Sequence, residues 1–328
     1  MVVLGIESTA HTASVGVVDE SAQVLGVASD MYRPASGGIH PREAATHHVE
    51  VFPQLVDRAL TLSSVRPQDI DAVAFSQGPG LGPCLRAGAT VARILSLAWD
   101  RPLVPVNHCV AHVEIARVLS GLDDPLLLYA SGGNTQVIAY SRGRYRVLGE
   151  TLDIGVGNFL DKLWIELGGT FPGGPQLEAD AKSGSELLPL PYSVHGMDVA
   201  FSGMLTAALA LSARGARRAD LSYSVEVTAY SMLTEITERA LAHLRGQAVV
   251  LGGGVACNER LRTMVREMVE GRGGTTFAPP RNLCVDNGAM IAWTGLLAHR
   301  AGQSVAVENS AVAPRQRTDL VTTPWRGG

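Results

Sequence analysis

Apolar and polar residues follow one another along the chain in blocks that predict strands, tight turns and helices. The first block, "VVLGIESTAHTASVGVVD" (residues 2–19), has the pattern of a strand, a small polar turn and a second strand. A helical pattern follows from about Pro41 to Leu60, with proline at the position where helices often begin. Residues 72–99 then predict a buried strand, a loop rich in glycine and proline, and another helix.

The same pattern restarts after a turn at residues 121–125. "PLLLYASGGNTQVIAY" (125–140) is again a strand, a small polar turn and a strand, and helices fill much of residues 158–245. "QAVVLGGGVACNERLRTMVREMV" (247–269) then predicts a strand, a triple-glycine turn and a helix. A strand–turn–strand unit at the start of each half predicts an internally duplicated α/β architecture with a cleft between two lobes.

The division into lobes follows from where the pattern restarts. We place the N-terminal lobe at residues 1–125 plus about 296–328, and the C-terminal lobe at residues 126–295. The tail from Glu308 to Gly328 is polar with scattered prolines, and we expect it to be an edge segment or a linker. A length of 328 residues allows two lobes, because single cores stop growing at roughly 250–300 residues.

Composition and charge narrow the class of protein. The chain is 46% hydrophobic and 18% charged, which is ordinary for a globular protein, and no run approaches the roughly 18 apolar residues of a membrane span. The N-terminus has no secretory pattern, so the cytoplasm is the expected compartment. A net charge of −4 gives no global sign of nucleic-acid binding. The four cysteines are too dispersed for a CxxC site and are expected to be buried, reduced thiols.

Three turns have the composition of anion-binding sites. The tips "ESTAHT" (7–12) and "SGGNT" (131–135) combine hydroxyls, small residues and free backbone N–H groups, which can surround a phosphate. "LGGGVACN" (251–258) leads into a helix N-terminus, where negative charge is also favoured. Each turn alone is more often only a turn, but three at strand ends favour a nucleotide site. None matches a P-loop or a GxGxxG fingerprint.

The stretch "VNHCVAHVE" (106–114) carries two histidines four residues apart. On a helix His108 and His112 share a face and can aim both rings at one metal ion, although such a pair often faces solvent or core instead. Zincin peptidases need a glutamate directly after the first histidine, and Cys109 stands there. The spacing therefore allows a metal and argues against a metalloprotease.

Other polar residues lie where they can complete a site. Tyr129 ends a predicted strand just before the second tip, and Asp286 precedes a late helix, where an N-cap role is equally expected. Asp161 and Glu178 flank glycine-containing turns and can equally be caps or surface charges. The residues alone predict a two-lobed nucleotide binder that has donors for a metal.

Nine motifs in a fixed order carry a resemblance to a known family. They are "GIESTAHT", "SQGPGLGPCLRAGATVAR", "VNHCVAHVE", "LYASGGNTQVIAY", "GETLDIGVGNFLDK", "FPGGPQLE", "AFSGMLTA", "GGGVACNERLR" and "DNGAMIA". Together they closely resemble the threonylcarbamoyltransferases that modify tRNA, namely bacterial TsaD and its archaeal and eukaryotic counterpart in the KEOPS complex. "MYRPASGGIHPREAATHH" and the tyrosine before "ASGGNT" favour an archaeal-like member.

The resemblance implies an actin-like fold of the sugar kinase, Hsp70 and actin class, with two lobes around a central nucleotide cleft. It assigns one divalent metal, with iron(II) favoured and zinc also suitable, to four ligands. These are His108, His112, Tyr129 and Asp286. It assigns substrate contacts to a second set, which is Tyr129, Ala130, Ser131, Gly132, Gly133, Asp161, Gly174, Glu178 and Asn258.

The implied reaction transfers threonylcarbamoyl from threonylcarbamoyl-adenylate to the exocyclic amine of the adenosine 3′ of a tRNA anticodon, position 37, and releases AMP. The metal would act as a Lewis acid, and no general base is evident. Implied partners are an adenine nucleotide or the acyl-adenylate, tRNA, and KEOPS-type subunits that include a small kinase, with no membrane. The alternatives are a metalloprotease, which Cys109 disfavours, and an ATPase or kinase on the same fold.

Overall fold

The computed structural model describes residues 1–34 and 37–327, and it contains two five-stranded sheets. The first sheet has the order β3-β2-β1-β4-β5. Its β1, β2 and β3 are antiparallel neighbours, whereas β1, β4 and β5 run parallel. The strands are β1 (Val2–Glu7), β2 (Thr12–Asp19), β3 (Val24–Met31), β4 (Ala72–Gly78) and β5 (Leu103–Asn107).

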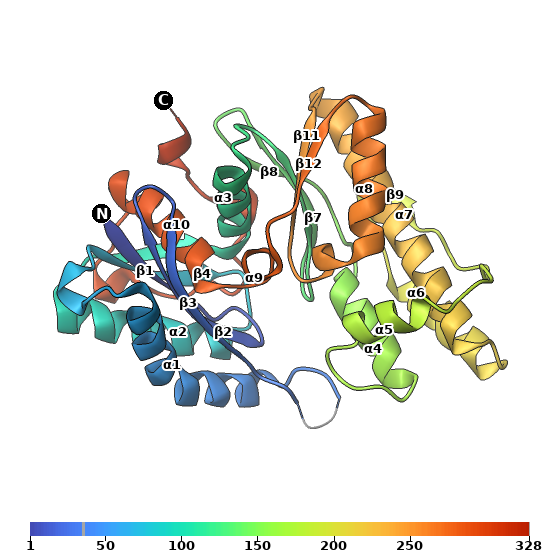
Figure 1. Cartoon of the computed structure of the whole chain (residues 1–328), viewed down its shortest axis with the longest axis horizontal. Helices are drawn as coiled ribbons and strands as arrows, with labels where there is room; N and C mark the ends of the chain where they lie inside the picture. The colour runs from blue at the N-terminus through green and yellow to red at the C-terminus, as the bar shows by residue number, and fades with distance from the viewer. Residues whose placement is uncertain (35–36, 328) are drawn as a thin grey trace.

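The second sheet repeats this topology strand for strand. Its order is β12-β11-β6-β7-β8, and β6 pairs antiparallel with β7 and parallel with β11, as β1 does with β2 and β4. The strands are β6 (Leu126–Ala130), β7 (Thr135–Ser141), β8 (Arg144–Glu150), β11 (Ala248–Gly252) and β12 (Thr275–Phe277). The predicted duplication of the α/β architecture is therefore confirmed (Figure 1).

Helices arrange the two sheets into alternating layers (Figure 1). Helices α1 (Pro41–Ser63) and α2 (Gly82–Trp99) pack on the outer face of the first sheet. Helices α3 (His108–Ser120) and α10 (Gly288–Arg300) fill its inner face, and α3 also packs on the second sheet. On the outer face of the second sheet, α7 (Arg218–Leu244) and α8 (Glu259–Gly271) pack against the strands. Helices α5 (Gly174–Ala181) and α6 (Ser202–Ala213) pack on α7, and α4 (Val156–Glu166) packs on α5 and α6.

Alternation along β6 decides which residues reach the middle of the molecule. Leu126, Leu128 and Ala130 join the core under the outer helices, while Leu127 and Tyr129 join the core that contains α3. Successive side chains of a strand point to opposite faces, so Tyr129 must face α3 if its neighbours face outward. The strand period thus brings the phenol to the helix that carries the two histidines.

Small residues allow α10 to lie unusually close to the first sheet. A Cβ on Gly5 would stand 2.2 Å from the Ala292 backbone nitrogen, and one on Gly16 would stand 2.3 Å from that of Ala289. The first amide of the helix, Gly288 N–H, donates to Ser14 Oγ at 2.9 Å. This close contact fixes the start of α10 and the residues that precede it, including Asp286.

The C-terminal segment differs from a free linker. Just before the tail, Val305 N–H donates to Leu103 O at 2.9 Å, so the chain forms a bridge at the edge strand β5. Farther on, Trp325 Nε1–H donates to the buried Glu114 carboxylate of α3 at 2.7 Å. The predicted lobe division at residues 126 and 296 stays a prediction, and α10, which begins inside the predicted second lobe, packs on β1 and β2.

Short elements complete the described chain, and none of its helices is long and apolar enough to cross a membrane. They are the ribbon β9 (Val194–His195) and β10 (Asp198–Val199), helix α9 (Arg281–Cys284), and the single turns η1 (Pro67–Asp69), η2 (Val255–Cys257), η3 (Val307–Asn309), η4 (Thr318–Leu320) and η5 (Pro324–Arg326).

Candidate functional site

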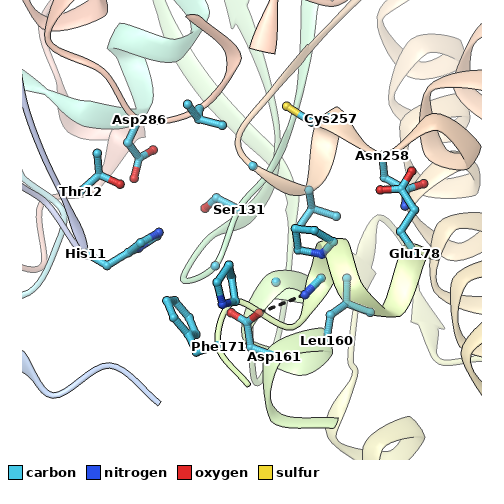
Figure 2. Close-up of a pocket in the computed structure, with 18 of the residues that line it drawn as sticks. His11, Thr12, Ser131, Leu160, Asp161, Phe171, Glu178, Cys257, Asn258 and Asp286 are labelled. Carbon is cyan, nitrogen blue, oxygen red and sulfur yellow. Dashed lines mark hydrogen bonds between the residues drawn. The ribbon is translucent and has the colours of Figure 1, made fainter. Parts of the chain in front are cut away.

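Two adjoining cavities open between the sheets, where the three predicted turns converge. The first, which we call the Asn258 cavity, is lined by Ser131, Asp161, Glu178 and Asn258 (Figure 2). The second, the Tyr129 cavity, is lined by Thr9, Ala10, His108, Tyr129, Gly133 and Lys162, among others. His11, Ser131, Gly132, Asp161, Phe171 and Asp286 border both cavities. Both hairpin tips therefore face the same space.

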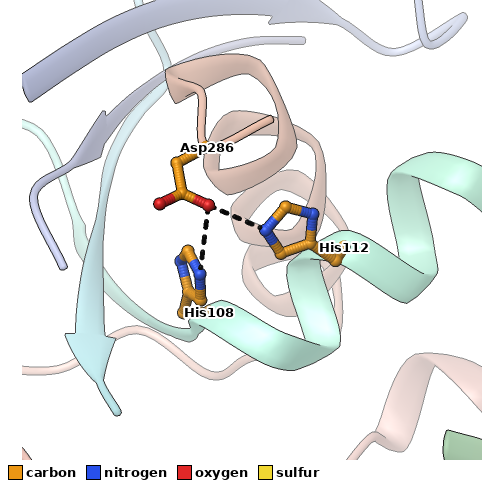
Figure 3. A group of neighbouring side chains, drawn as sticks. All are labelled: His108, His112 and Asp286. Carbon is orange, nitrogen blue, oxygen red and sulfur yellow. Dashed lines mark hydrogen bonds and ion pairs between the residues drawn. The ribbon is translucent and has the colours of Figure 1, made fainter. Parts of the chain in front are cut away.

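The two histidines lie at the start of α3 and point at one carboxylate (Figure 3). Asn107 caps this helix through a hydrogen bond from Val110 N–H, which fixes where the first turn begins. His108 Nε2 lies 3.5 Å and His112 Nε2 lies 3.2 Å from Asp286 Oδ1. Tyr129 Oη lies 2.8 Å from His108 Nε2. Four donors from three distant parts of the sequence thus meet at one point.

The charges of this cluster depend on its burial. Burial disfavours a charged His108, but the carboxylates of Glu7 and Asp286 outweigh this effect and raise its pKa to about 9. Burial lowers the pKa of His112 and raises that of Tyr129 well above its ordinary value. Burial by itself would raise the pKa of Asp286, but the two neighbouring histidines outweigh burial and hold this pKa well below the usual range.

The cluster has the composition and geometry of a metal centre. Donor atoms of His108, His112 and Asp286 all lie within 4.8 Å of one another, and both histidines are buried. Imidazole, carboxylate and phenol oxygen suit iron or zinc. Glu7, which is fully buried, accepts from His108 Nδ1 at 2.9 Å and orients the ring, as carboxylates do for metal-bound histidines. The residues present therefore fit a divalent metal.

The alternative role of Asp286 as a helix cap is wrong. Asn287 caps α10, because its Oδ1 accepts from Met290 N–H at 2.9 Å. The Asp286 carboxylate is turned instead toward the histidines and the two cavities. Capping of α10 therefore does not account for the position of the Asp286 carboxylate.

Asp161 and Gly174 lie against each other in the wall of the Asn258 cavity. One oxygen of Asp161 accepts from the backbone N–H groups of Gly173 and Gly174 at 2.7 and 3.3 Å (Figure 2). Burial raises the pKa of Asp161, and these two donors oppose the rise. One carboxylate oxygen is thus held by the loop, and the carboxylate borders both cavities.

Asn258 and Glu178 belong to a polar network at the far end of the same cavity. Asn258 Oδ1 caps α8 through Leu261 N–H, and its Nδ2 donates to Glu226 at 2.6 Å. Glu178 accepts from Glu259 N–H at 3.1 Å. Burial raises the pKa of Glu226, although Arg260 and Asn258 oppose this shift. The network holds both predicted residues in place beside the cavity.

Residues of the "SGGN" tip line the cavities, whereas Ala130, directly before the tip, lies in the core. Ser131 and Gly132 border both cavities, whereas Gly133 borders only the Tyr129 cavity. Ala130 is fully buried in the outer core of the second sheet, so its side chain does not reach either cavity. Any contact of Ala130 with a ligand would come from its backbone.

The expectation of four buried thiols is wrong for one cysteine. All four are free, and Cys84, Cys109 and Cys284 are buried, but Cys257 is half-buried and lines the Asn258 cavity. Its thiol lies beside that of Cys284, which lowers the pKa of Cys257 to about 7. The sequence separation of these two residues concealed their proximity.

Three functional candidates were missed by sequence reasoning. Glu7 orients His108, His11 borders both cavities, and Glu226 holds Asn258. Glu7 had a visible sign, because a charged residue at the end of an apolar strand needs a buried partner. His11 was visible only as one polar residue of a turn, and Glu226 only as one residue of a long helix.

Comparison with known proteins identifies the family. The family model for tRNA N6-adenosine threonylcarbamoyltransferase (TsaD) matches residues 23–293. The chain belongs to this family. It is 53% identical over 325 residues to the tRNA N6-adenosine threonylcarbamoyltransferase of Archaeoglobus fulgidus, which covers 99% of this chain and 100% of the relative. The predicted resemblance to archaeal members is confirmed.

Other relatives of the family are longer than this chain. A probable bifunctional tRNA threonylcarbamoyladenosine biosynthesis protein of Thermoplasma volcanium is 51% identical over 325 residues, which are 99% of this chain but 62% of that protein. The corresponding protein of Methanocaldococcus jannaschii is 51% identical over 60% of its length. The chain thus spans about three fifths of these bifunctional relatives.

Solved structures confirm the actin-like fold predicted for the family. HypF of T. kodakarensis superimposes with a TM-score of 0.63 at 17% identity, over 90% of this chain and 47% of that chain. Component A of the (R)-2-hydroxyglutaryl-CoA dehydratase of Acidaminococcus fermentans gives 0.57 at 14% identity, over 90% and 97%. At these identities the likeness concerns the fold alone.

Proposed function

We propose that this chain transfers threonylcarbamoyl from threonylcarbamoyl-adenylate to the exocyclic amine of adenosine 37 in tRNA and releases AMP. One observation carries the proposal. His108, Tyr129 and Asp286 of the buried cluster line the Tyr129 cavity, and Asp286 also lines the Asn258 cavity, so a ligand in either cavity can reach the cluster. Membership of the family supports the reaction.

His108, His112, Tyr129 and Asp286 would hold one divalent metal, with iron(II) favoured and zinc also suitable. The bound metal would supply Lewis acidity toward the carbonyl of the acyl-adenylate. Glu7 keeps the His108 ring in the orientation that directs Nε2 toward Asp286. The four ligands come from α3, from β6 of the second sheet and from the loop before α10.

The remaining predicted residues would bind the adenylate. The turn at Ser131, Gly132 and Gly133, together with the backbone of Ala130, would surround the phosphate with N–H groups that stabilise charge on the leaving AMP. The nucleoside would extend into the Asn258 cavity. Its polar contacts there would be Asp161, Gly174, Glu178 and Asn258.

Partners would complete the site for tRNA. The mildly acidic chain has too little positive charge to hold tRNA strongly alone, so KEOPS-type subunits that include a small kinase would supply much of the binding surface. The names of the bifunctional relatives support association with a second activity. The cytoplasmic location and the lobes at residues 1–125 with 296–328 and at 126–295 belong to the same proposal.

Neither rival reaction fits the site as well. A metalloprotease would need a base after the first histidine, but Cys109 there is buried in the core, and burial raises its pKa to about 12. A kinase or ATPase of this fold would have no use for a cluster of two buried histidines and a tyrosine beside the phosphate turn. Steady ATP turnover that persists in His108→Ala would favour that rival.

A reconstituted reaction tests the proposal. Purified chain, partner subunits, unmodified tRNA and threonylcarbamoyl-adenylate should yield modified adenosine and one AMP per transfer. His112→Ala should abolish the product and the bound metal while leaving the circular dichroism spectrum unchanged. The matched control is His195→Ala, which changes an exposed histidine outside both cavities. Full product from His112→Ala would remove the metal from the mechanism.

A further inference from the structure

His11 lies where the two cavities meet, at the tip of the β1–β2 hairpin. It borders both the Asn258 cavity and the Tyr129 cavity, as does Phe171 from the opposite lobe. The two rings meet edge to face, with centroids 5.5 Å apart and planes at 89°. Figure 2 shows the imidazole pointing into the cavity from the side of Asp286, across from Ser131. Phe171 thus fixes the ring at the junction without hydrogen bonding to it.

A structural role does not account for this histidine. Its Nδ1 has no hydrogen-bond partner among the residues that the structure describes. Polar atoms in such places are usually paired, so an unpaired one requires an explanation. Burial lowers the pKa of His11, and the carboxylates of Asp286 and Asp161 only partly oppose this. The ring of His48 lies beneath the tip, and burial lowers its pKa to about 4. His48 therefore does not supply a proton to His11. Burial therefore favours the neutral form of the His11 imidazole, which can accept a proton.

The two cavities that meet at His11 differ in volume. The Asn258 cavity contains the polar residues proposed to bind the adenylate. The Tyr129 cavity, of about 650 Å³ against about 170 Å³ for the Asn258 cavity, has room for the acceptor nucleoside. Its apolar residues, which suit a flat base, are Ile39, Pro79, Leu81, Ile165 and Phe171, and polar residues such as Asn158, Lys162 and Glu166 also line it. A base that enters there meets the acyl-adenylate beside His11.

We propose that His11 is a catalytic residue that accepts the proton from the exocyclic amine of the acceptor adenosine. This inference rests on the proposed transfer reaction and assigns the base that the reaction lacks. The amine nitrogen forms a bond to the carbamoyl carbon, and the bond from that carbon to the phosphate oxygen breaks. AMP leaves with the electron pair, the amine proton moves to the imidazole, and His11 then releases it to water.

The test is single-turnover transfer with saturating threonylcarbamoyl-adenylate and tRNA, on the full chain with its partner subunits. His11→Gln keeps the size and polarity of the side chain but removes the base, and His11→Ala leaves room for added imidazole. We expect the rate constant at pH 7.5 to fall about 100-fold or more in both variants, the usual contribution of a general base. The adenylate affinity should change less than threefold, and the metal content should stay at the wild-type value. His195→Ala serves as the matched control, with no change expected.

A pH profile and chemical rescue separate a base from a packing residue. Because burial lowers the pKa of His11, the wild-type rate should rise with pH in a range below about 6.5, the ordinary value for imidazole, and then level off, whereas His11→Gln should lack this rise. Added imidazole should raise the rate constant of His11→Ala at least 10-fold. It should not change the rate constant of His11→Gln, because the glutamine side chain fills the space. A residue that only packs against Phe171 would give neither result.

The outcomes separate this inference from the function on which it rests. Wild-type transfer together with an unchanged rate and pH profile in His11→Gln would overturn the role of His11 and leave the transfer reaction standing. Loss of adenylate binding or of metal in both variants, without rescue by imidazole, would also overturn it. Absence of any transfer by the wild-type complex, despite bound metal and adenylate, would overturn both.

Discussion

The two hairpin tips occupy equivalent places in the duplicated fold but differ in chemistry. The β1–β2 tip presents side chains, with Glu7 against His108 and His11 toward the cavities. The β6–β7 tip presents mostly backbone, since Ser131 closes its own turn with Asn134 and two glycines follow. Under the proposed function, one topology would thus provide orienting and acid–base groups at one tip and an anion-binding turn at the other. The duplication accounts for the facing tips, and the difference between them would let unlike substrates meet there.

The largest loss of stability is expected from a substitution in β1 where α10 packs against it, beneath the first tip. In Gly5→Ala the new methyl group would collide with the backbone of Ala292 at 2.2 Å and with Gly288 O at 2.4 Å, so the helix must move away from the strand. We expect unfolding free energy to fall by about 3 kcal/mol or more, measured by urea titration. Gly133→Ala at the second tip is the matched control, because no atom of the described residues lies within 4 Å of its new Cβ. Equal losses in both variants would contradict the account.

The next effect is on metal affinity and concerns Glu7, the carboxylate of the first tip that orients His108. Glu7→Gln keeps the shape but removes the charge that faces His108 Nδ1. We expect metal affinity to fall about 10- to 100-fold, the usual cost of losing such a partner, as measured by competition with a chromophoric chelator. Glu20→Gln, an exposed carboxylate, should leave the affinity unchanged. Unaltered affinity in Glu7→Gln would show that the ring needs no such support.

An effect of similar size concerns pH and arises beneath the first tip, where His48 is fully buried. The pKa of His48 is lowered to about 4 because burial disfavours its charged form. The unfolded chain binds the proton near pH 6.5 and the folded chain does not, so stability falls as pH drops from about 6.5 to 4. The loss should be about 2–3 kcal/mol. His48→Leu should remove this part of the pH dependence in urea titrations, and an unchanged slope would contradict the pKa assignment.

The smallest effect is expected at the second tip. Ser131→Ala removes one hydroxyl that bonds Asn134 N–H and Asn134 O at 3.2 and 3.1 Å, which should cost about 1 kcal/mol of stability. Because the turn would bind phosphate through N–H groups, the transfer rate should fall only a few-fold. A loss as large as that in His11→Gln would show that the second tip also works through its side chains.

The sequence predicted the fold through local patterns, and the structure agrees where the patterns were strong. Alternation located both hairpins, and the expected helix from Pro41 is α1. Contacts across long separations were beyond such patterns. His112 and Asp286 are 174 residues apart, and only the family resemblance joined them. The packing of Trp325 on Glu114 was also hidden, because a polar tail with prolines has no periodicity that indicates a docking site.

Within the site, sequence reasoning found the residues whose type is unusual for their place and missed those that depend on packing. Two histidines at helical spacing drew notice, whereas Glu7 and His11 looked like ordinary members of a turn. Their importance comes from the pairing of β1 with β4 and of β4 with β5, which brings His108 to Glu7, and from the opposing lobe, which brings Phe171 to His11. Such contacts follow from tertiary structure and not from local propensity.

The central claim is a single metal between the tips, and anomalous X-ray diffraction tests it most directly. Crystals of the chain loaded with iron(II) or zinc should show one strong anomalous peak about 2.0–2.3 Å from His108 Nε2, His112 Nε2 and an Asp286 oxygen, with Tyr129 Oη beside it. A peak elsewhere, or metal-loaded crystals in which these four side chains stand apart with no peak among them, would contradict the account.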